Sequence, residues 1–394
     1  MLVHRIVGDC PGCGGVRKFG NVWVRPDHVR RGCLTCTYTD TVPLPPLRKK
    51  ILYLDQGFLS HAFRAKIPRF VDAAERISQL SALQLLAAPF SSVHEDETNQ
   101  WKGKSGKNKD DLMKFIKATS SGDEFEPAYE VEQTQISRAF QAFVSGGSPV
   151  FQLHEDDAVE EDIHAWDDYL WIDVGRYFGD VERMRTLKYQ SVEALVDAFE
   201  HWRKSSETFD EQVALEIEEA ARVYIDAYIA FPARIAGGDL AAVLDAPLIS
   251  SVLQSLLLSL PPEKMEDRWK KVGRFLASQH FKEVPFLWLT ARIYATLKEQ
   301  VKNGAYTDRA RAIRRLRGLY QDIKHVATYA PYCDVFFIDS AMAALVTDPR
   351  INLEGRYGVK VFTAAALDNF LTWLNELHAG MSQEHRAALT AAYP

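Results

Sequence analysis

The segment Ile51-Leu52-Tyr53-Leu54-Asp55 decides the fold class of this 394-residue chain. A short, continuously apolar run is typical of a parallel strand that is buried on both faces. The aspartate that ends the run therefore lies at the carboxyl end of the predicted strand, where ligands of open parallel sheets bind. Strand-to-helix turns also use aspartate as a helix N-cap, so a structural role for this residue stays open.

A second apolar run of the same kind lies far along the chain, at 335–338, and it also ends in an aspartate, Asp339. The preceding segment, 322–331, has apolar residues at the spacing of a helix that packs on a sheet. A helix followed by a strand returns the chain to one sheet edge, so we expect Asp322, at the start of this helix, and Asp339 to converge there. Asp334 lies about 16 Å away at the other end of the strand, and we predict a structural role for it.

A fourth carboxylate comes from the segment 88–98. Ser92 and Glu95 have the spacing of a capping box, which gives Glu95 a structural role. Glu97 has no such role, so it ranks ahead of Glu95 and His94 as a metal-facing group. Carboxylates at one sheet edge repel one another unless a hard divalent cation neutralises them. The sequence therefore predicts a Mg²⁺ or Mn²⁺ site, with four candidate ligands: Asp55, Glu97, Asp322 and Asp339.

Four of the five cysteines form two C-x-x-C pairs, Cys10 with Cys13 and Cys33 with Cys36. Four thiolates at this spacing predict a structural Zn²⁺ site. The segments 21–25 and 37–42 read as strands, so residues 1–46 are expected to form a zinc ribbon that depends on its metal for folding. Two disulfides or a redox pair are the alternatives. The fifth cysteine, Cys333, is predicted to be a small buried residue.

The acidic segments resemble, in order and spacing, the four motifs of PIN-like nucleases: residues 53–60, the helix that carries Glu97, Asp322 with Ile323 and Ala327, and Phe337-Ile338-Asp339. The last strand and helix, 359–363 and 367–377, are similar to the final unit of that family. The resemblance covers residues 51–100 and 305–378. It implies an α/β/α sandwich on a parallel sheet, in which the acidic quartet holds Mg²⁺ or Mn²⁺ and cuts phosphodiester bonds, usually in RNA.

This reading divides the chain into a zinc ribbon (1–46), a first part of the PIN-like core (47–109), a mainly helical insertion (110–304) and a second part of the core (305–394). Helices are expected at 131–144, 163–178, 207–231 and 239–260, the third ending at Pro232. Between residues 155 and 226 there are 21 acidic residues against seven Lys or Arg. Such a surface repels nucleic acid, so the insertion is expected to shape access, to dimerise or to bind a protein.

Positive charge is concentrated elsewhere. The net charge is −6, but residues 1–50 hold nine Lys or Arg against three Asp, a local balance of +6. The arginines of the zinc ribbon are either phosphate contacts or a solvated face. Near the predicted acidic site, four residues are candidate nucleic-acid contacts: Lys104, Lys107, Arg314 and Arg315. Acidic and histidine residues at 154–167 are either a further metal site or a solvated helix start.

The expected activity is that of a metal-dependent endonuclease, with RNA favoured over DNA as substrate. The alternatives are a nucleic-acid or protein-binding module on an inactive PIN-like scaffold, and a phosphatase or other phosphoester hydrolase that uses the same acids. The segment 103–107 lacks the spacing of a P-loop, which argues against nucleotide binding of that kind. The charged N-terminus does not have the pattern of a secretory signal, so a cytoplasmic location is expected.

Overall fold

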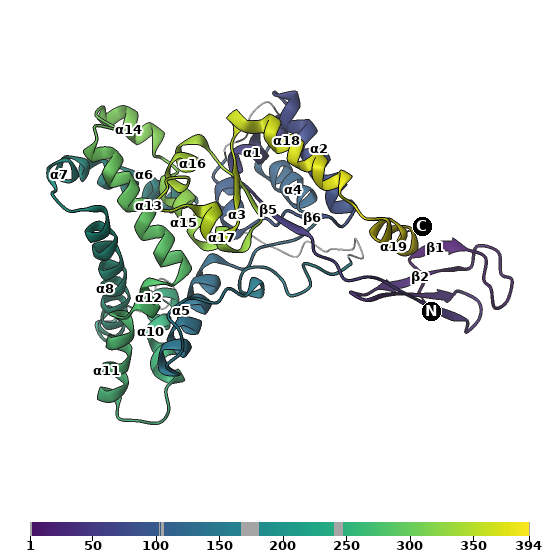
Figure 1. Cartoon of the computed structure of the whole chain (residues 1–394), viewed down its shortest axis with the longest axis horizontal. Helices are drawn as coiled ribbons and strands as arrows, with labels where there is room; N and C mark the ends of the chain where they lie inside the picture. Colours follow the sequence, from purple (N-terminus) through teal and green to yellow (C-terminus); the bar gives the residue numbers. More distant parts are fainter. Residues whose placement is uncertain (1, 102, 104–105, 167–180, 240–246, 394) are drawn as a thin grey trace.

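The chain forms two four-stranded sheets, an antiparallel one at the N-terminus and a parallel one in the body of the molecule (Figure 1). The computed structural model describes residues 2–101, 103, 106–166, 181–239 and 247–393. The N-terminal sheet has the order β1-β2-β3-β4: Arg5–Gly8, Phe19–Val24, His28–Cys33 and Thr39–Pro43. The parallel sheet has the order β6-β5-β7-β8: Leu86–Ala87, Lys50–Leu54, Val335–Phe337 and Lys360–Phe362.

The strands predicted at 51–54, 335–338 and 359–363 are confirmed as parallel neighbours. Leu54 pairs with Phe337, and Phe337 pairs with Phe362. At the opposite end of the sheet, the Asp334 carboxylate accepts hydrogen bonds from Lys50 Nζ (2.6 Å) and from the Ile51 amide (2.9 Å). Asp334 thus fixes the register of β5 against β7, which agrees with the structural role predicted for it.

Helices cover both faces of the parallel sheet. One face, with Leu52, Leu54 and Phe337, packs on four helices: α1 (Gln56–Arg64), α2 (Pro68–Ala82), α4 (Lys109–Thr119) and α18 (Leu367–Ala379). The other face, with Tyr53 and Phe336, packs on α15 (Leu319–Tyr329) and belongs to the core of the helical region. The expectation of a parallel sheet between two helical layers is therefore confirmed.

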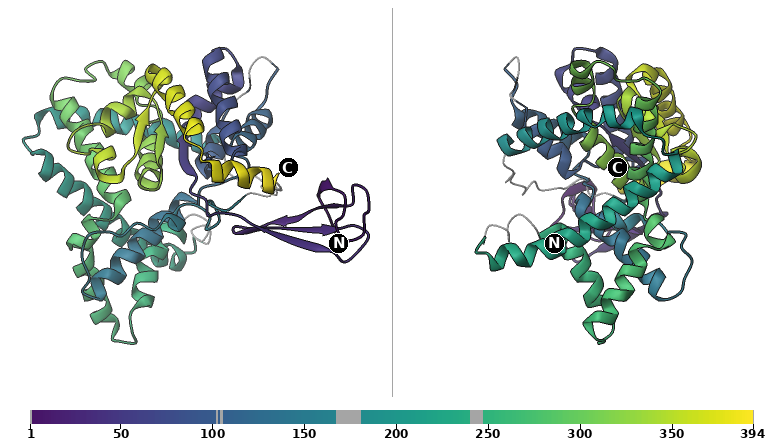
Figure 2. Two further views of the ribbon diagram at one scale, coloured as in Figure 1. Left: turned by 45° about the vertical axis from the view of Figure 1, so that its right-hand side comes forward. Right: turned by 90° about the vertical axis from the view of Figure 1, so that its left-hand side faces the viewer.

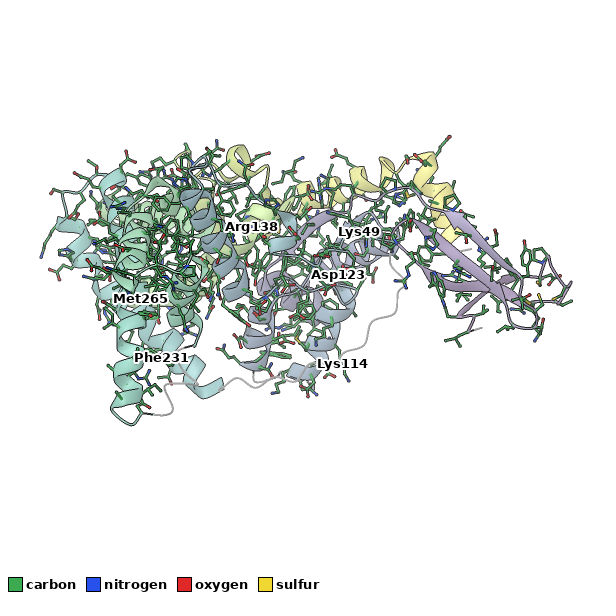
Figure 3. The ribbon with its side chains drawn as sticks, turned by 90° about the horizontal axis from the view of Figure 1, so that it is seen from below. Lys49, Lys114, Asp123, Arg138, Phe231 and Met265 are labelled. Atoms are coloured by element: carbon green, nitrogen blue, oxygen red, sulfur yellow. The ribbon has the colours of Figure 1, made fainter. Side chains whose placement is uncertain are left out.

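The helical region lies between β6 and β7 in the sequence, to one side of the sheet (Figures 1 and 3). The labelled side chains of Arg138, Phe231 and Met265 lie in it, whereas Lys49 lies at the junction with the N-terminal sheet (Figure 3). Among the described residues no helix is long and apolar enough to span a membrane. The helices of this region are α5 (Ala128–Val144), α6 (Val181–Asp197), α7 (Phe199–Lys204), α8 (Phe209–Ala236), α10 (Pro247–Ser259), α11 (Met265–Leu276), α12 (Gln279–Lys282) and α13 (Pro285–Lys302).

Some predicted helix ends are wrong. The 28-residue helix α8 continues through Pro232 to Ala236, because the exposed proline removes only one backbone hydrogen bond near the end of a long ladder. Helix α15 begins at Leu319 rather than at Asp322, which lies in its first turn. Most of the helix predicted at 163–178 and the start of that at 239–260 lie outside the described residues.

The N-terminal sheet projects from the body and is joined to it by the C-terminal helix α19 (Gln383–Ala392), which lies beside β1 (Figure 2). Val24 and Val29 of the sheet pack with Ala388 and Ala392 of this helix. Trp166 also belongs to this cluster, and its indole N–H donates to the Pro45 carbonyl. The remaining short helices are α3 (Ser92–Asn99), α14 (Arg309–Arg315), α16 (Ser340–Val346) and α17 (Leu353–Tyr357).

Candidate metal sites

The four predicted zinc ligands come together at the tip of the N-terminal sheet. Their sulfur atoms all lie within 4.8 Å of one another. The Cys10 and Cys36 sulfurs are 3.7 Å apart, and the Cys13 and Cys33 sulfurs are 3.8 Å apart. A tetrahedral zinc ion with Zn–S bonds of ~2.3 Å requires sulfur atoms about 3.8 Å from each other. The cysteines are therefore arranged to hold a structural Zn²⁺, and this separation is too long for a disulfide.

Local hydrogen bonds prepare these sulfurs for a cation. The Thr35 amide donates to Cys33 Sγ and the Tyr38 amide donates to Cys36 Sγ, each at 3.4 Å. Hydrogen bonds from Thr35, its side chain first and then its amide, lower the pKa of Cys33 to about 6. Because the thiolate is the form that binds zinc, the Thr35 donors favour metal binding at Cys33 at neutral pH. At Cys36 the Tyr38 amide acts in the same direction, but burial and the neighbouring cysteines raise the pKa to about 12.

The second candidate site is formed by Asp55, Glu97, Asp322 and Asp339, here called the acidic edge. Asp55 follows β5, and Asp339 follows the neighbouring strand β7. The Asp55 amide donates to the Phe337 carbonyl (3.0 Å), which fixes the two strand ends side by side. Each aspartate caps the next helix: Asp55 Oδ1 accepts from the Phe58 amide and Asp339 Oδ1 from the Met342 amide, both at 2.7 Å. The capping role is thus real, but it uses one oxygen of each carboxylate.

A buried layer of three rings lies beneath the acidic edge. The rings of Tyr53 and His94 are 5.3 Å apart, those of Tyr53 and His325 are 5.3 Å apart, and those of His94 and His325 are 5.6 Å apart. The Tyr53 hydroxyl and His325 Nδ1 share a hydrogen bond. Each ring is close in sequence to one acid. Tyr53 is two residues before Asp55 on the strand, where residues two apart face the same side. His94 and Glu97, and likewise Asp322 and His325, are three residues apart on a helix and also share a side.

His94 fixes the position of α3 against β5. The Ser91 amide donates to His94 Nδ1 (2.9 Å), so the imidazole proton is on Nε2, which donates to the Leu54 carbonyl (2.8 Å). Burial lowers the pKa of His94 and keeps the ring neutral. The predicted capping box of Ser92 and Glu95 is wrong: the helix starts one residue earlier, with Ser91 as N-cap and His94 in the position of the capping acid. His94 is therefore a positioning residue rather than a metal ligand.

Burial and the negative charges of the acidic edge raise the pKa values of two neighbouring groups, Tyr53 and Asp55. Burial, and then the negative charges of Asp55, Glu97 and Asp322, raise the pKa of Tyr53. Burial, with smaller contributions from the charges of Asp339 and Glu97, raises the pKa of Asp55 to about 7 against the opposing hydrogen bond from the Phe58 amide. Asp55, Glu97 and Asp322 are half-buried, and Asp339 is exposed. These charge effects indicate that Glu97 and Asp322 lie near the strand ends that carry Asp55 and Asp339.

The acidic edge is more open than the cysteine site. Among the described residues, only the four cysteines form a group of three or more potential ligands whose atoms all lie within 4.8 Å of one another. Direct ligands of one Mg²⁺ lie within about 4.2 Å of one another, because Mg–O bonds are 2.0–2.1 Å long. As placed, no three of the four acids meet this condition, so at most two of them can bind one ion directly and waters would complete its coordination.

The predicted nucleic-acid contacts differ in their surroundings. Lys104 lies outside the described residues. Lys107 Nζ donates to the Phe63 carbonyl (2.5 Å) and lies over the Phe63 ring, so this lysine is engaged at the end of α1. Arg314 and Arg315 are exposed on α14. The Arg315 guanidinium carbon lies 5.8 Å from the centre of the Tyr306 ring.

Tyr306 is a site residue that the sequence analysis missed. Its backbone has a positive φ of 59°, which is uncommon for a tyrosine, and its carbonyl accepts a hydrogen bond from Arg203 (2.9 Å). Burial raises the pKa of Tyr306, the Arg315 charge opposes this shift, and the Asp339 charge adds to it. Tyr306 is therefore in contact with a cation of α14 and is subject to the charge of Asp339. No sequence motif marks it, because the contact with Arg203 of α7 exists only in the folded chain.

The acidic and histidine cluster at 154–167 has a structural explanation in its described part. The Lys49 amide donates to His164 Nδ1 (3.2 Å), and His164 Nε2 lies 3.0 Å from Glu155 Oε2 and also contacts Arg48. Glu155 also pairs with Arg48. These contacts attach the linker before β5 to the helical region, and they use the groups that a metal ion would need.

Comparisons of the chain with protein-family profiles, with curated proteins and with solved structures found no match. The interpretation of both candidate sites therefore depends on their geometry and chemistry.

The raised pKa of Asp55 predicts a pH-dependent effect of Asp55→Asn on stability without divalent metal. The carboxylate has a pKa of ~3.9 in an unfolded chain and of about 7 in the folded protein. Ionising Asp55 is therefore harder in the folded state, and the free energy of unfolding falls as pH rises from about 4 to about 7. Asparagine removes the charge and still caps α1. We expect Asp55→Asn to raise the free energy of unfolding by ~1–2 kcal/mol at pH 8, after allowance for solvent screening, and to change it little at pH 4.

Thermal unfolding at both pH values measures this effect, with Asp339→Asn as the matched control because Asp339 is also an N-cap but is exposed. A lower stability of Asp55→Asn at pH 8 would show that the carboxylate carries no such penalty.

Proposed function

We propose that this protein is a metal-dependent endonuclease that hydrolyses phosphodiester bonds, with single-stranded RNA as its preferred substrate. In this proposal the acidic edge binds Mg²⁺ or Mn²⁺, and the zinc-bearing N-terminal sheet assists substrate binding. The observation that carries the proposal is the pair of adjacent parallel strands, β5 and β7, each of which ends in an aspartate that caps the following helix.

The chemistry of the acidic edge supports hydrolysis. A divalent ion held by carboxylates can activate a bound water as the nucleophile and can stabilise charge on the leaving oxygen. Asp55 and Asp339 each keep one carboxylate oxygen that the helix cap does not use. The ring layer of Tyr53, His94 and His325 holds the strand and helices that carry the acids, which is the kind of support that a preorganised site requires.

Cations near the acidic edge support a phosphate-containing polymer as substrate. Arg315 lies over Tyr306, and Tyr306 is influenced by the Asp339 charge. Arg314 is exposed on the same helix. Guanidinium groups beside a metal-carboxylate site can hold the phosphates that flank the scissile bond without reading the base sequence.

A cleavage assay tests the proposal. The wild-type chain is freed of loosely bound metal by gel filtration rather than by a chelator, so that zinc stays in place. It is then incubated with labelled single-stranded RNA or DNA, with and without Mg²⁺ or Mn²⁺. Cleavage of RNA that requires added metal is the expected result. Absence of cleavage of any polymer under all conditions would contradict the proposal and would favour a binding protein on the same scaffold.

A further inference from the structure

The two faces of the N-terminal sheet have different surroundings. A β-bulge at Val22 in β2 separates two register pairs: Asn21 lies opposite Arg31, and Trp23 lies opposite Arg30. Because adjacent residues of a strand point to opposite faces, Arg31 and Arg30 lie on different faces. Asn21 and Arg31 therefore share one face, here called the inner face, and Trp23 and Arg30 share the other, here called the outer face.

The inner face is occupied by the C-terminal helix. Asn21 Nδ2 donates to the Ala392 carbonyl (2.6 Å), and Arg31 donates to the Ala391 carbonyl. Arg31 Nε also donates to Asn21 Oδ1 (3.2 Å). These two side chains satisfy carbonyl groups at the end of α19 that have no partner within the helix. The arginine of the inner face is thus committed to the fold and is not available to a ligand.

On the outer face, Arg25 and Arg30 both make cation–π contacts with the ring of Trp23. The guanidinium carbon of Arg30 lies 5.1 Å from the centre of the Trp23 ring, and that of Arg25 lies 5.9 Å from it. Within the described part of the chain neither arginine has an ion pair with a carboxylate. The Arg30 Nε group is buried and has no hydrogen-bond partner. Trp23 contacts both guanidinium groups, and as far as the structure describes the chain neither group is neutralised by a carboxylate.

We propose that the outer face of the N-terminal sheet binds single-stranded nucleic acid, with Arg25 and Arg30 on backbone phosphates and Trp23 as an aromatic contact for a base. Interleaved aromatic and basic side chains are what single-strand binding requires, because bases stack on rings while cations follow the backbone. The charge distribution favours this partner over a protein: residues 1–46 hold six Lys or Arg against three Asp, a balance of +3 in a chain of net charge −6.

The inference concerns binding and is separable from catalysis. The outer face is on the projecting N-terminal sheet, whereas the acidic edge lies at the parallel sheet (Figure 2). Binding can therefore be measured without cleavage, on the full-length wild-type chain with zinc in place and no other divalent metal added.

The experiment measures fluorescence anisotropy of labelled oligomers of about 12 nucleotides, a length within the range of single-strand sites. The probes are oligouridylate, oligothymidylate and a duplex of the same length, at a series of salt concentrations. Trp23→Ala is expected to weaken single-strand binding about fivefold or more. The double variant Arg25→Gln with Arg30→Gln is expected to reduce the slope of log affinity against log salt by about 1.4, which corresponds to two phosphate contacts. Arg76→Gln, a half-buried arginine of α2, is a control for the loss of one positive charge away from the N-terminal sheet and should leave the slope unchanged.

Zinc content near that of the wild type shows that each variant keeps the N-terminal sheet, and the double arginine variant tests the proposal even where Trp23→Ala unfolds it. Preference for RNA over DNA, or equal binding of both, supports the inference. Unchanged binding in both variants, tighter binding of the duplex, or no binding by the wild-type chain overturns it. If the wild-type chain binds single strands but does not cleave them, only the nuclease proposal is contradicted. If the Trp23 and arginine variants bind and cleave as well as the wild type, only this inference is contradicted.

Discussion

Asp55→Asn and Asp339→Asn are each expected to lower metal-dependent cleavage on the order of 10³-fold or more, the scale on which loss of a catalytic group reduces kcat. The reason is that each substitution replaces a charged oxygen ligand by a neutral amide at the acidic edge. Asparagine is also a good helix N-cap, so the hydrogen bonds to Phe58 and Met342 can be kept. The loss should therefore appear in catalysis while the protein stays folded.

The matched control is Asp334→Asn, at the other end of β7. Asp334 pairs with Lys50 and is part of the strand register, but it is remote from the acidic edge. Cleavage by this variant should stay within about threefold of the wild type, because asparagine keeps an oxygen that can accept from the Ile51 amide and position 334 is at the opposite end of β7. Glu97→Gln and Asp322→Asn should follow the two aspartate variants. Undiminished cleavage by both Asp55→Asn and Asp339→Asn would exclude the acidic edge as the active site.

Loss of the zinc ligands is expected to unfold the N-terminal sheet. In Cys10→Ser with Cys33→Ser, two of the four sulfurs are lost, and a unit this small cannot bury enough apolar surface to fold without metal. Zinc binding supplies ~10–16 kcal/mol in small zinc domains, so its loss far exceeds what local contacts can offset. Zinc should fall from about one per chain to none in elemental analysis.

The effect should extend to the C-terminal helix. Helix α19 ends on Asn21 and Arg31 of the N-terminal sheet, so its amides should exchange hydrogen faster once that sheet unfolds. Amides of β5 and β7 should keep their protection, because the parallel sheet has its own core. Cys333→Ala, which removes a buried thiol away from the zinc ligands, should retain zinc. Zinc retained at the wild-type level in the double serine variant would disprove the assignment.

Local sequence signals predicted the parts of the fold that depend on short segments. The apolar runs that end in Asp55 and Asp339 predicted parallel strands, because burial on both faces requires such runs. The C-x-x-C pairs predicted the zinc ligands, because the spacing itself fixes the geometry. The strand 28–33 was missed, since Arg30 and Arg31 break its apolar pattern: one arginine lies on the outer face and the other caps a helix from the far end of the chain.

The parts that depend on tertiary contacts could not be predicted. His94 has the capping role that was expected for Glu95, because the acceptor for His94 Nε2 is the Leu54 carbonyl, which a sequence pattern cannot place. Tyr306 is recognisable only through Arg203 and Arg315. In each case the decisive partner belongs to another element, so the pattern of neighbouring residues carries no information about it.

The pairing of β5 with β7 has a consequence for biosynthesis. Ile51 and Asp334, which share a hydrogen bond, are 283 positions apart. At ~5–20 residues per second, a ribosome needs tens of seconds to make the chain between them. During that time β5 has no partner on its β7 side, and the intervening helices can pack first. A nascent or truncated chain that ends before β7 therefore lacks the paired aspartates, and the second half must be synthesised before the acidic edge can form.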